Sequence, residues 1–268
     1  MDVAWWLHFQ YRECVTAIDT TLDSRLTDIA HVLGERVRPD LVLLSGSRAL
    51  GTAREDSDFD LMIVVRDPSA VESSRKAAYA ALRELQVSAD VLGRSVEEYE
   101  RRQHDPGFMD WMIAREGVVL YSTGLVPQRS PERVRETDPS EDSLAMWMQR
   151  AASDINAADA LLASPDPSID AICFHAHAAV EKWLKALIVV HTQVFPPKTH
   201  ELPTLLALLP EDIRSDAVMT AACAMLMTVY PKSRYPEAGM PSASEATEAV
   251  KAARTVRTIV AARLPGYA

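Results

Sequence analysis

The hydrophobic positions of the first 124 residues follow two different spacings. Apolar residues three and four apart between residues 15 and 33, and again after Pro68, predict amphipathic helices. Two short helical pieces are expected within 96–116, separated by a Pro-Gly step. Short apolar runs predict strands at residues 41–44, 60–65, 87–92 and 118–121. Helices and strands that alternate in this way predict an α/β (α+β) domain over residues 1–124.

The second half of the chain shows helical spacing almost throughout. Residues 125–141 contain three prolines, many charges and few apolar side chains, so they are predicted to be a linker. After this linker, apolar stripes predict a bundle of four or five helices over 142–268. The last helix is expected to begin at Ser242, where Glu245 completes a capping box. Thr199 is expected to cap the short helix that follows it.

Composition and charge narrow the class of protein. A hydrophobic content of 48% and a charged content of 25% are ordinary for a globular protein, and the formal net charge of −10 argues against broad binding to a nucleic-acid backbone. The net charge does not exclude a local basic patch that binds RNA or a nucleotide. The three cysteines form no CxxC pair, no signal peptide begins the chain, and the longest apolar run, near residues 183–190, is too short to span a bilayer. We therefore expect a cytoplasmic protein that does not interact with a membrane.

Two aspartates lie where a buried strand is predicted. Asp58 and Asp60 are two residues apart, so both carboxylates point to the same face of that strand. A divalent cation between them relieves their repulsion, and hard carboxylate oxygens suit Mg²⁺, which also keeps water and substrate phosphates as ligands. Asp90, on the next predicted strand, is a candidate third carboxylate that would allow two ions to be held or would accept the proton of an attacking hydroxyl. The alternative for Asp90 is an ordinary acidic residue at a strand edge.

A Gly-Ser step follows the first predicted strand. Gly46 allows a close approach of the backbone, and the Ser47 hydroxyl, with N–H groups at the start of a short helix, can bind a phosphate. Arg48 is a candidate for neutralising phosphate charge, with an exposed helix arginine as the equal alternative. Ser57 is expected to cap the turn before the second strand. Phosphate-binding groups beside metal ligands are what metal-assisted phosphoryl transfer requires.

The spacing of these residues resembles a known signature. Gly46-Ser47, ten residues and then Asp58-Phe59-Asp60 resemble the GSx10DxD pattern of the DNA polymerase beta-type nucleotidyltransferase superfamily, and the run from GSRALG to SDFDLMIV is similar to the minimal nucleotidyltransferases (MNT). The resemblance implies a small mixed sheet flanked by helices, Mg²⁺ as cofactor and ATP as substrate. It implies transfer of a nucleoside monophosphate, commonly AMP, to a hydroxyl with release of pyrophosphate. Its metal and phosphate ligands map onto Asp58, Asp60, Asp90, Gly46 and Ser47.

The helical half shows a second resemblance. The segments FHAHAAVEKWLKAL, KTHELPTLL and SRYP, within residues 142–264, resemble the HEPN family, whose domains are four- or five-helix bundles that usually form dimers. No arginine from residue 150 onward precedes a histidine at the spacing of the Arg-x4–6-His motif of HEPN RNases, so RNA cleavage is not expected. Candidate residues for an acceptor or nucleotide pocket are His175, Lys182, Lys185, His200, Arg234 and Tyr235. The alternative is a solvated face with weak ion pairs, and it applies equally to the i, i+4 series His177, Glu181 and Lys185.

Two functional hypotheses follow. The first is an MNT–HEPN enzyme whose acceptor is an aminoglycoside-like small molecule, a protein tyrosine or an RNA end, with Tyr230 and Tyr235 as tyrosines of the chain itself. The second is a non-catalytic nucleotide-sensing or RNA-associated HEPN module of toxin–antitoxin type, without the HEPN RNase motif. A homodimer formed through the bundle is expected. The sequence identifies neither the acceptor nor the base of the donor.

Overall fold

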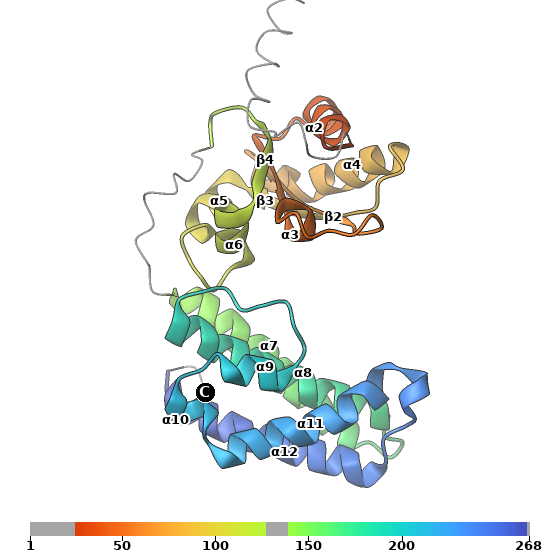
Figure 1. The fold of residues 1–268 in the computed structure, drawn as a ribbon, viewed down its shortest axis with the longest axis vertical. Coiled ribbons are helices and arrows are strands. Elements are labelled where there is room, and N and C mark those ends of the chain that lie inside the picture. The colour runs from red at the N-terminus through yellow and green to blue at the C-terminus, as the bar shows by residue number, and fades with distance from the viewer. Residues whose placement is uncertain (1–24, 127–138, 267–268) are drawn as a thin grey trace, which may run out of the picture. The chain divides into compact units, whose positions relative to one another are not determined.

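A computed structural model of the protein describes residues 25–126 and 139–266. The chain divides into two compact units, Met1–Arg135 and Glu136–Ala268, and Figure 1 labels the elements of each. The buried apolar side chains fall into two clusters in the first unit and one large cluster in the second. Two predicted features, the first helix up to residue 24 and the linker over 127–138, lie outside the described residues.

The first unit is built on a mixed sheet of four strands. The strands are β1 (Leu41–Ser45), β2 (Phe59–Val65), β3 (Ala89–Ser95) and β4 (Val118–Ser122). The helices are α2 (Arg25–Arg36), α3 (Gly46–Ala49), α4 (Val71–Glu84), α5 (Val96–Arg102) and α6 (Met109–Glu116), and a 3-10 turn, η1 (Pro68–Ala70), precedes α4. The strand order is β3-β2-β1-β4, with β2 and β3 parallel and β1 antiparallel to both of its neighbours. The small mixed sheet flanked by helices is therefore confirmed.

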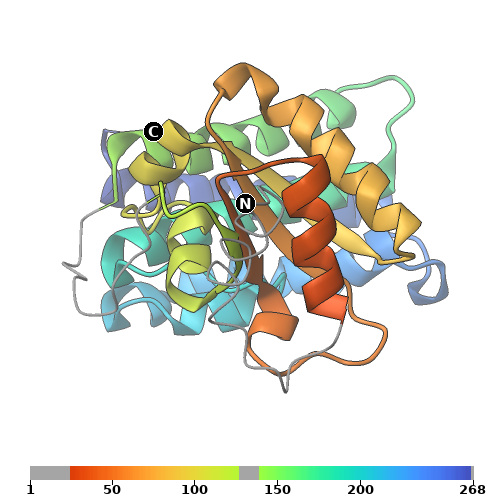
Figure 2. The ribbon, with the colours of Figure 1, turned by 90° about the horizontal axis from the view of Figure 1, so that it is seen from above.

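Alternate residues of the strands face two separate cores. In β1, Val42 and Leu44 lie in a core with side chains of α2 and α4, whereas Leu41 and Leu43 lie in a core with side chains of α5 and α6. Figure 2 shows the same two layers, with α2 and α4 in red and orange on one side of the strands and α5 and α6 in yellow and green on the other. Side chains alternate in the same way along β2 and β3, so residues two positions apart on one of these strands face the same layer.

A buried ion pair attaches α6 to the sheet. Arg94 of β3 donates from Nε and Nη2 to the two carboxylate oxygens of Asp110 at 2.7 and 3.1 Å, and the Asp110 side chain is fully buried. A bidentate guanidinium–carboxylate pair is the geometry in which a buried carboxylate is best compensated. The pair also shows that even-numbered positions of β3 face the α5 and α6 layer.

The second unit is a helical bundle. Its helices are α7 (Glu141–Leu162), α8 (Ile169–Thr192), α9 (Leu202–Ala207), α10 (Glu211–Arg214), α11 (Ala217–Arg234) and α12 (Ala243–Arg263), and a 3-10 turn, η3 (Pro236–Ala238), follows α11. Helix α8 packs against α7, α9, α11 and α12, and 14 of its 24 residues are buried. A helix with neighbours on most sides buries polar as well as apolar positions, which matters for the polar groups described below. None of the helices in the described parts of the chain has the length and apolar character that a membrane span requires.

The helix ends test two of the predicted caps. The Ser242 side chain accepts from Glu245 N–H, and the Glu245 carboxylate accepts from Ser242 N–H, so the predicted capping box is confirmed. The prediction for Thr199 is wrong by two residues, because α9 begins at Leu202 with Glu201 in the N-cap position. The Thr199 hydroxyl instead accepts from Glu201 N–H at 3.1 Å, before the helix starts.

Candidate functional site

Three strands of the sheet place the predicted site residues at one edge. Strand β1 ends at Ser45, which pairs with Asp60 near the start of β2, and Asp60 in turn pairs with Asp90 near the start of β3. Asp60 lies two residues before Met62 on β2, and Asp90 lies two residues before Leu92 on β3. Met62 and Leu92 face the α5 and α6 layer, so the side chains of Asp60 and Asp90 lie on that same face of the sheet. Asp58 is the residue immediately before β2. The fold therefore brings Asp60 and Asp90 to one edge and one face of the sheet, and Asp58 lies next to this edge in the chain.

Gly46 follows β1 and lies directly against the Asp60 carboxylate. Its φ of +69° is in the left-handed region, and a Cβ added at this position would lie 1.9 Å from Asp60 Oδ2. The Ser45 hydroxyl donates to the Asp60 carbonyl oxygen at 3.2 Å and links the same two strands. Only glycine fits at this position, both because of the backbone conformation and because of the carboxylate beside it. The glycine of the Gly-Ser step is thus tied physically to one of the predicted metal ligands.

Arg48 of α3 holds the loop that leads into β2. Its Nε and Nη2 donate to the Ser57 carbonyl oxygen at 3.0 and 2.5 Å, and Nη2 also donates to the Glu55 carbonyl oxygen at 3.0 Å. The guanidinium carbon lies 4.0 Å from the centroid of the Phe59 ring. In the same loop, the Ser57 hydroxyl accepts from Arg54 N–H at 2.9 Å, as expected for a residue that stabilises the turn. Ser47 is half-buried and its carbonyl accepts from Thr52 N–H at 2.9 Å.

The carboxylates of this edge have the chemistry of Mg²⁺ ligands. Asp58 and Asp90 are exposed, Asp60 is half-buried, and all three supply hard anionic oxygens. Within residues 25–126 and 139–266, no three His, Cys, Asp or Glu side chains are already gathered around one metal position. Mg²⁺ is usually held by one or two carboxylates together with water and substrate phosphates, so a complete protein cage is not required. The residues present fit this mode of binding.

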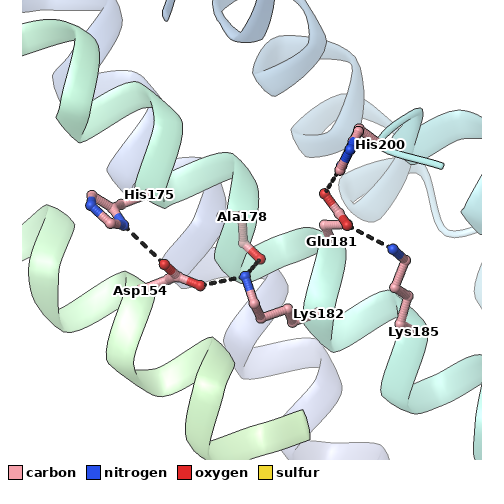
Figure 3. A network of polar contacts seen from close by, with 7 residues as sticks. All are labelled: Asp154, His175, Ala178, Glu181, Lys182, Lys185 and His200. Carbon is pink, nitrogen blue, oxygen red and sulfur yellow. Dashed lines mark hydrogen bonds and ion pairs between the residues drawn. The ribbon is translucent and has the colours of Figure 1, made fainter. Parts of the chain in front are cut away.

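In the bundle, Asp154 of α7 joins two of the predicted pocket residues. It contacts His175 Nδ1 at 2.9 Å and accepts from Lys182 Nζ at 2.6 Å, and both of these residues lie on α8. Lys182 Nζ also donates to the Ala178 carbonyl oxygen at 3.3 Å (Figure 3). Asp154 connects α7 to α8 and was not predicted. Its only signal in the sequence is an acidic residue beside the apolar stripe of α7, and such a residue is more commonly solvated.

Glu181 joins two further predicted residues. Its two carboxylate oxygens bind Lys185 Nζ at 2.7 Å and His200 Nδ1 at 2.9 Å (Figure 3). Burial raises the pKa of Glu181, but the bonds with Lys185 and His200 outweigh burial and leave that pKa below its usual value. His200 thereby links the segment between α8 and α9 to α8. The interpretation of the His177, Glu181 and Lys185 series as a solvated face is wrong, because His177 and Lys185 are buried.

His177 is a buried histidine between α8 and α11. It is fully buried, and neither ring nitrogen has a hydrogen-bond partner within the parts of the chain that the structure describes. Its ring stacks on Tyr230, with centroids 3.8 Å apart and an interplanar angle of 18°. Burial lowers the pKa of His177 to about 4, so the ring is neutral at neutral pH. The Tyr230 hydroxyl accepts from Arg234 Nη1 at 3.2 Å, and burial raises the pKa of Tyr230.

The candidate pocket residues of the bundle thus fall into separate groups. His175 and Lys182 share Asp154, Lys185 and His200 share Glu181, and Arg234 binds Tyr230. Tyr235 follows α11 as its C-cap residue and is exposed, with 50% of its surface accessible. His175 and Lys182 connect α8 to α7 through Asp154, His200 connects the segment after α8 to Glu181, and the Lys185–Glu181 pair lies within α8.

Two protein-family models match the two compact units of the chain separately. A nucleotidyltransferase domain model matches residues 26–113, and a HEPN domain model matches residues 144–263. The crystal structure of TT1696 from Thermus thermophilus is similar, with 27% sequence identity, 44% of this chain and 94% of that chain covered, and a TM-score of 0.38. A search of curated proteins gave no match. The chain is therefore a fusion of a nucleotidyltransferase domain with a HEPN domain.

Proposed function

We propose that the protein is a Mg²⁺-dependent nucleotidyltransferase that transfers a nucleoside monophosphate, AMP from ATP, to a hydroxyl acceptor. The observation that carries the proposal is the contact between Gly46 and the Asp60 carboxylate, at an edge that also holds Asp58 and Asp90. The glycine of a phosphate-binding turn and a metal ligand are adjacent, as transfer of a metal-bound nucleotide requires.

Each residue of this edge has a role in the proposed reaction. The backbone at Gly46 and the Ser47 hydroxyl bind the triphosphate, while Ser57 and Arg48 support the loop beside it. Asp58, Asp60 and Asp90 would hold Mg²⁺, two ions in the full complex. When bound, Mg²⁺ neutralises phosphate charge and favours the ionised form of the attacking hydroxyl.

The transfer itself is an in-line displacement. The acceptor oxygen forms a bond to the α-phosphorus, and the bond from that phosphorus to the oxygen bridging to the β-phosphate breaks. Pyrophosphate leaves with the electron pair of the broken bond. The proton of the acceptor hydroxyl passes to a carboxylate, for which Asp90 is the proposed group because it is exposed at the same edge.

The acceptor belongs to one of three classes: an aminoglycoside-like small molecule, a protein tyrosine or an RNA end. Within the bundle, His175, Lys182, Lys185, His200, Arg234 and Tyr235 are the residues proposed for an acceptor or nucleotide pocket. A homodimer formed through the HEPN bundle and a cytoplasmic location complete the proposal. Tyr235 is the more accessible of the two tyrosines considered as acceptors, since Tyr230 is 8% exposed and stacked on His177.

The test is a transfer assay with the full chain, α-labelled ATP, Mg²⁺ and one acceptor from each class. We expect release of pyrophosphate and label on one acceptor. We also expect the loss of both signals in Asp58→Asn combined with Asp60→Asn, which keeps the size of both side chains. A folded wild-type protein that binds ATP tightly and labels none of the three acceptor classes contradicts the proposal and favours a nucleotide-sensing module. Omission of Mg²⁺, or its removal with a chelator, must abolish transfer in the same assay.

A further inference from the structure

Asp58 is the last residue of the loop between α3 and β2. Asp58 is exposed, and within the described part of the chain its side chain has no hydrogen bond or ion pair. The position of its carboxylate therefore depends on the backbone on either side of it. Ser57 precedes Asp58 and Phe59 follows it, so the contacts of these two residues decide where the carboxylate lies.

Both neighbours of Asp58 contact one side chain, Arg48. Its guanidinium donates twice to the Ser57 carbonyl oxygen and lies 4.0 Å from the centroid of the Phe59 ring. A third bond, to the Glu55 carbonyl oxygen, extends the contact further back along the loop. Arginine is suited to this because its planar guanidinium donates in its plane and stacks on an aromatic ring with its face. Lysine offers neither feature.

Arg48 also connects the loop to the phosphate-binding turn. It lies on α3, two residues after Gly46, and Gly46 contacts Asp60. Two contacts therefore act on the residues of this edge. Gly46 lies against Asp60, and Arg48 contacts the residues on either side of Asp58. Two of the three guanidinium nitrogens, Nε and Nη2, donate to backbone carbonyls of this loop.

We propose that Arg48 is a positioning residue that fixes the Asp58 carboxylate for binding of the metal–nucleotide complex. Arg48 acts through the backbone around Asp58 and does not act through its charge on the nucleotide phosphates. The catalytic consequence rests on the proposed function, whereas the binding of a divalent cation can be measured whether or not an acceptor is known. Residues that orient metal ligands typically change metal affinity or activity by roughly 10- to 100-fold when they are replaced.

The experiment measures Mn²⁺ binding to the full chain in the presence of a non-hydrolysable ATP analogue, by electron paramagnetic resonance of free Mn²⁺. The variants are Arg48→Ala, Arg48→Lys, Asp58→Asn and the double variant Arg48→Lys with Asp58→Asn. The matched control is Arg54→Ala, which removes one positive charge from the same loop and keeps the bond from the residue 54 N–H to Ser57. Affinity for the analogue without metal is measured in parallel, and thermal unfolding shows which variants are folded.

We expect Arg48→Ala and Arg48→Lys to weaken Mn²⁺ binding by about tenfold or more. Arg54→Ala should change it by less than about twofold, and affinity for the analogue without metal should stay unchanged in Arg48→Ala and Arg48→Lys. The double variant should bind Mn²⁺ no more weakly than Asp58→Asn, because a residue that acts through Asp58 has no further effect once that carboxylate is gone. Arg48→Lys keeps the charge and most of the side-chain volume, so it provides the test if Arg48→Ala does not fold.

Three results would overturn the inference. The first is wild-type Mn²⁺ affinity in Arg48→Lys, because a charge alone would then be sufficient. The second is a loss of Mn²⁺ binding free energy in the double variant equal to the sum of the losses in Arg48→Lys and Asp58→Asn. The third is a fall in metal-free affinity for the analogue in Arg48→Ala, which would place the guanidinium on the phosphates. If the coupling is found but no acceptor is labelled, the positioning role of Arg48 stands and only the proposed function fails.

Discussion

The sheet edge of the nucleotidyltransferase domain and the HEPN bundle use their carboxylates in opposite ways. In the HEPN bundle, the side chains of Asp154 and Glu181 are only 16% and 12% exposed, and each binds one lysine and one histidine. In the nucleotidyltransferase domain, Asp58 and Asp90 are exposed at the sheet edge, and neither side chain has a hydrogen bond or ion pair with any residue that the structure describes. The same residue types therefore have charged partners within the chain in the bundle, whereas Asp58 and Asp90 at the sheet edge have none among the described residues.

The difference follows from the cost of burying a charge. A nearly buried carboxylate requires cations and hydrogen-bond donors from its own chain, because the loss of hydration is otherwise uncompensated. A carboxylate at a solvated sheet edge keeps its water and can exchange that water for an external cation. The carboxylates of the bundle are thus expected to stabilise the fold, whereas those of the sheet edge are expected to serve the reaction and to contribute little to folding.

Gly46→Ala gives the largest expected effect. The added Cβ would lie 1.9 Å from Asp60 Oδ2, so the carboxylate must move away from the proposed metal position. We expect nucleotidyl transfer to fall by about a thousandfold, which corresponds to about 4 kcal/mol in the activation free energy. The measurement is the rate of pyrophosphate release at saturating ATP and Mg²⁺.

Gly51→Ala is the matched control for this change. Gly51 has the same φ of +69°, but an added Cβ there has no atom within 4 Å. Both alanine variants therefore carry the same backbone strain, about 1 kcal/mol, and only Gly46→Ala displaces Asp60. Equal losses of activity in the two variants would show that strain alone is responsible, and would contradict the role given to the contact with Asp60.

The next effect concerns His177 and the pH dependence of folding. Burial lowers the pKa of His177 to about 4, from about 6.5 in an unfolded chain. Between these values the unfolded chain binds more protons than the folded one, so acid destabilises the fold, by about 3 kcal/mol over this range. Of the charged groups nearby, Glu181 opposes this shift, whereas His200 and Lys182 strengthen it.

Urea unfolding of the full chain between pH 7.5 and 4, followed by tryptophan fluorescence, tests this expectation against His177→Phe. Phenylalanine keeps the aromatic stack on Tyr230 but does not titrate, so the difference between the two pH profiles isolates His177. At pH 7.5 the variant should be at least as stable as the wild type, because it removes two buried nitrogens without partners. Identical pH profiles would mean that the histidine is solvated or paired in solution.

Local patterns predicted the strands of the sheet. Apolar runs indicated the four strands, and the two-residue spacing of Asp58 and Asp60 predicts a shared face, because strand alternation depends only on neighbouring residues. Asp90 was placed on the next strand, but its direct pairing with Asp60 depends on strand register, which no local pattern fixes. The contacts of Arg48 also could not be predicted, since they depend on the path of the loop between Gly51 and Ser57.

In the bundle, the helices were predictable and the polar contacts were not. The i, i+4 spacing of His177, Glu181 and Lys185 resembles a solvated face, yet α8 has helices on most sides and buries two of the three. Asp154 binds residues 21 and 28 positions away, so its role depends on how α7 packs on α8. Such pairings are set by tertiary packing, which the periodicity of a single helix does not contain.

Asp154→Asn measures the stabilising role of a bundle carboxylate. The change keeps the shape of the side chain and leaves His175 and Lys182 without a negatively charged partner. Because both partners are partly exposed and can recover some hydration, we expect a loss of about 2 kcal/mol in the free energy of unfolding. Glu248→Gln is the control, since its pair with Lys251 is exposed on both sides and should contribute less than about 0.5 kcal/mol. Equal effects of the two substitutions would contradict a structural role for Asp154.

The smallest expected effect is that of Asp90→Asn on stability. Asp90 is exposed and pairs in register with Asp60, so its charge repels a neighbouring carboxylate and binds no cation of the described chain. Removal of this charge should leave the free energy of unfolding unchanged or raise it by up to about 0.5 kcal/mol, as measured by urea unfolding in a buffer without divalent cations. The gain should disappear at high salt, where the repulsion is screened. A loss of stability as large as that in Asp154→Asn would mean that Asp90 is compensated within the protein, and the sheet edge would then not differ from the bundle in the way its carboxylates are used.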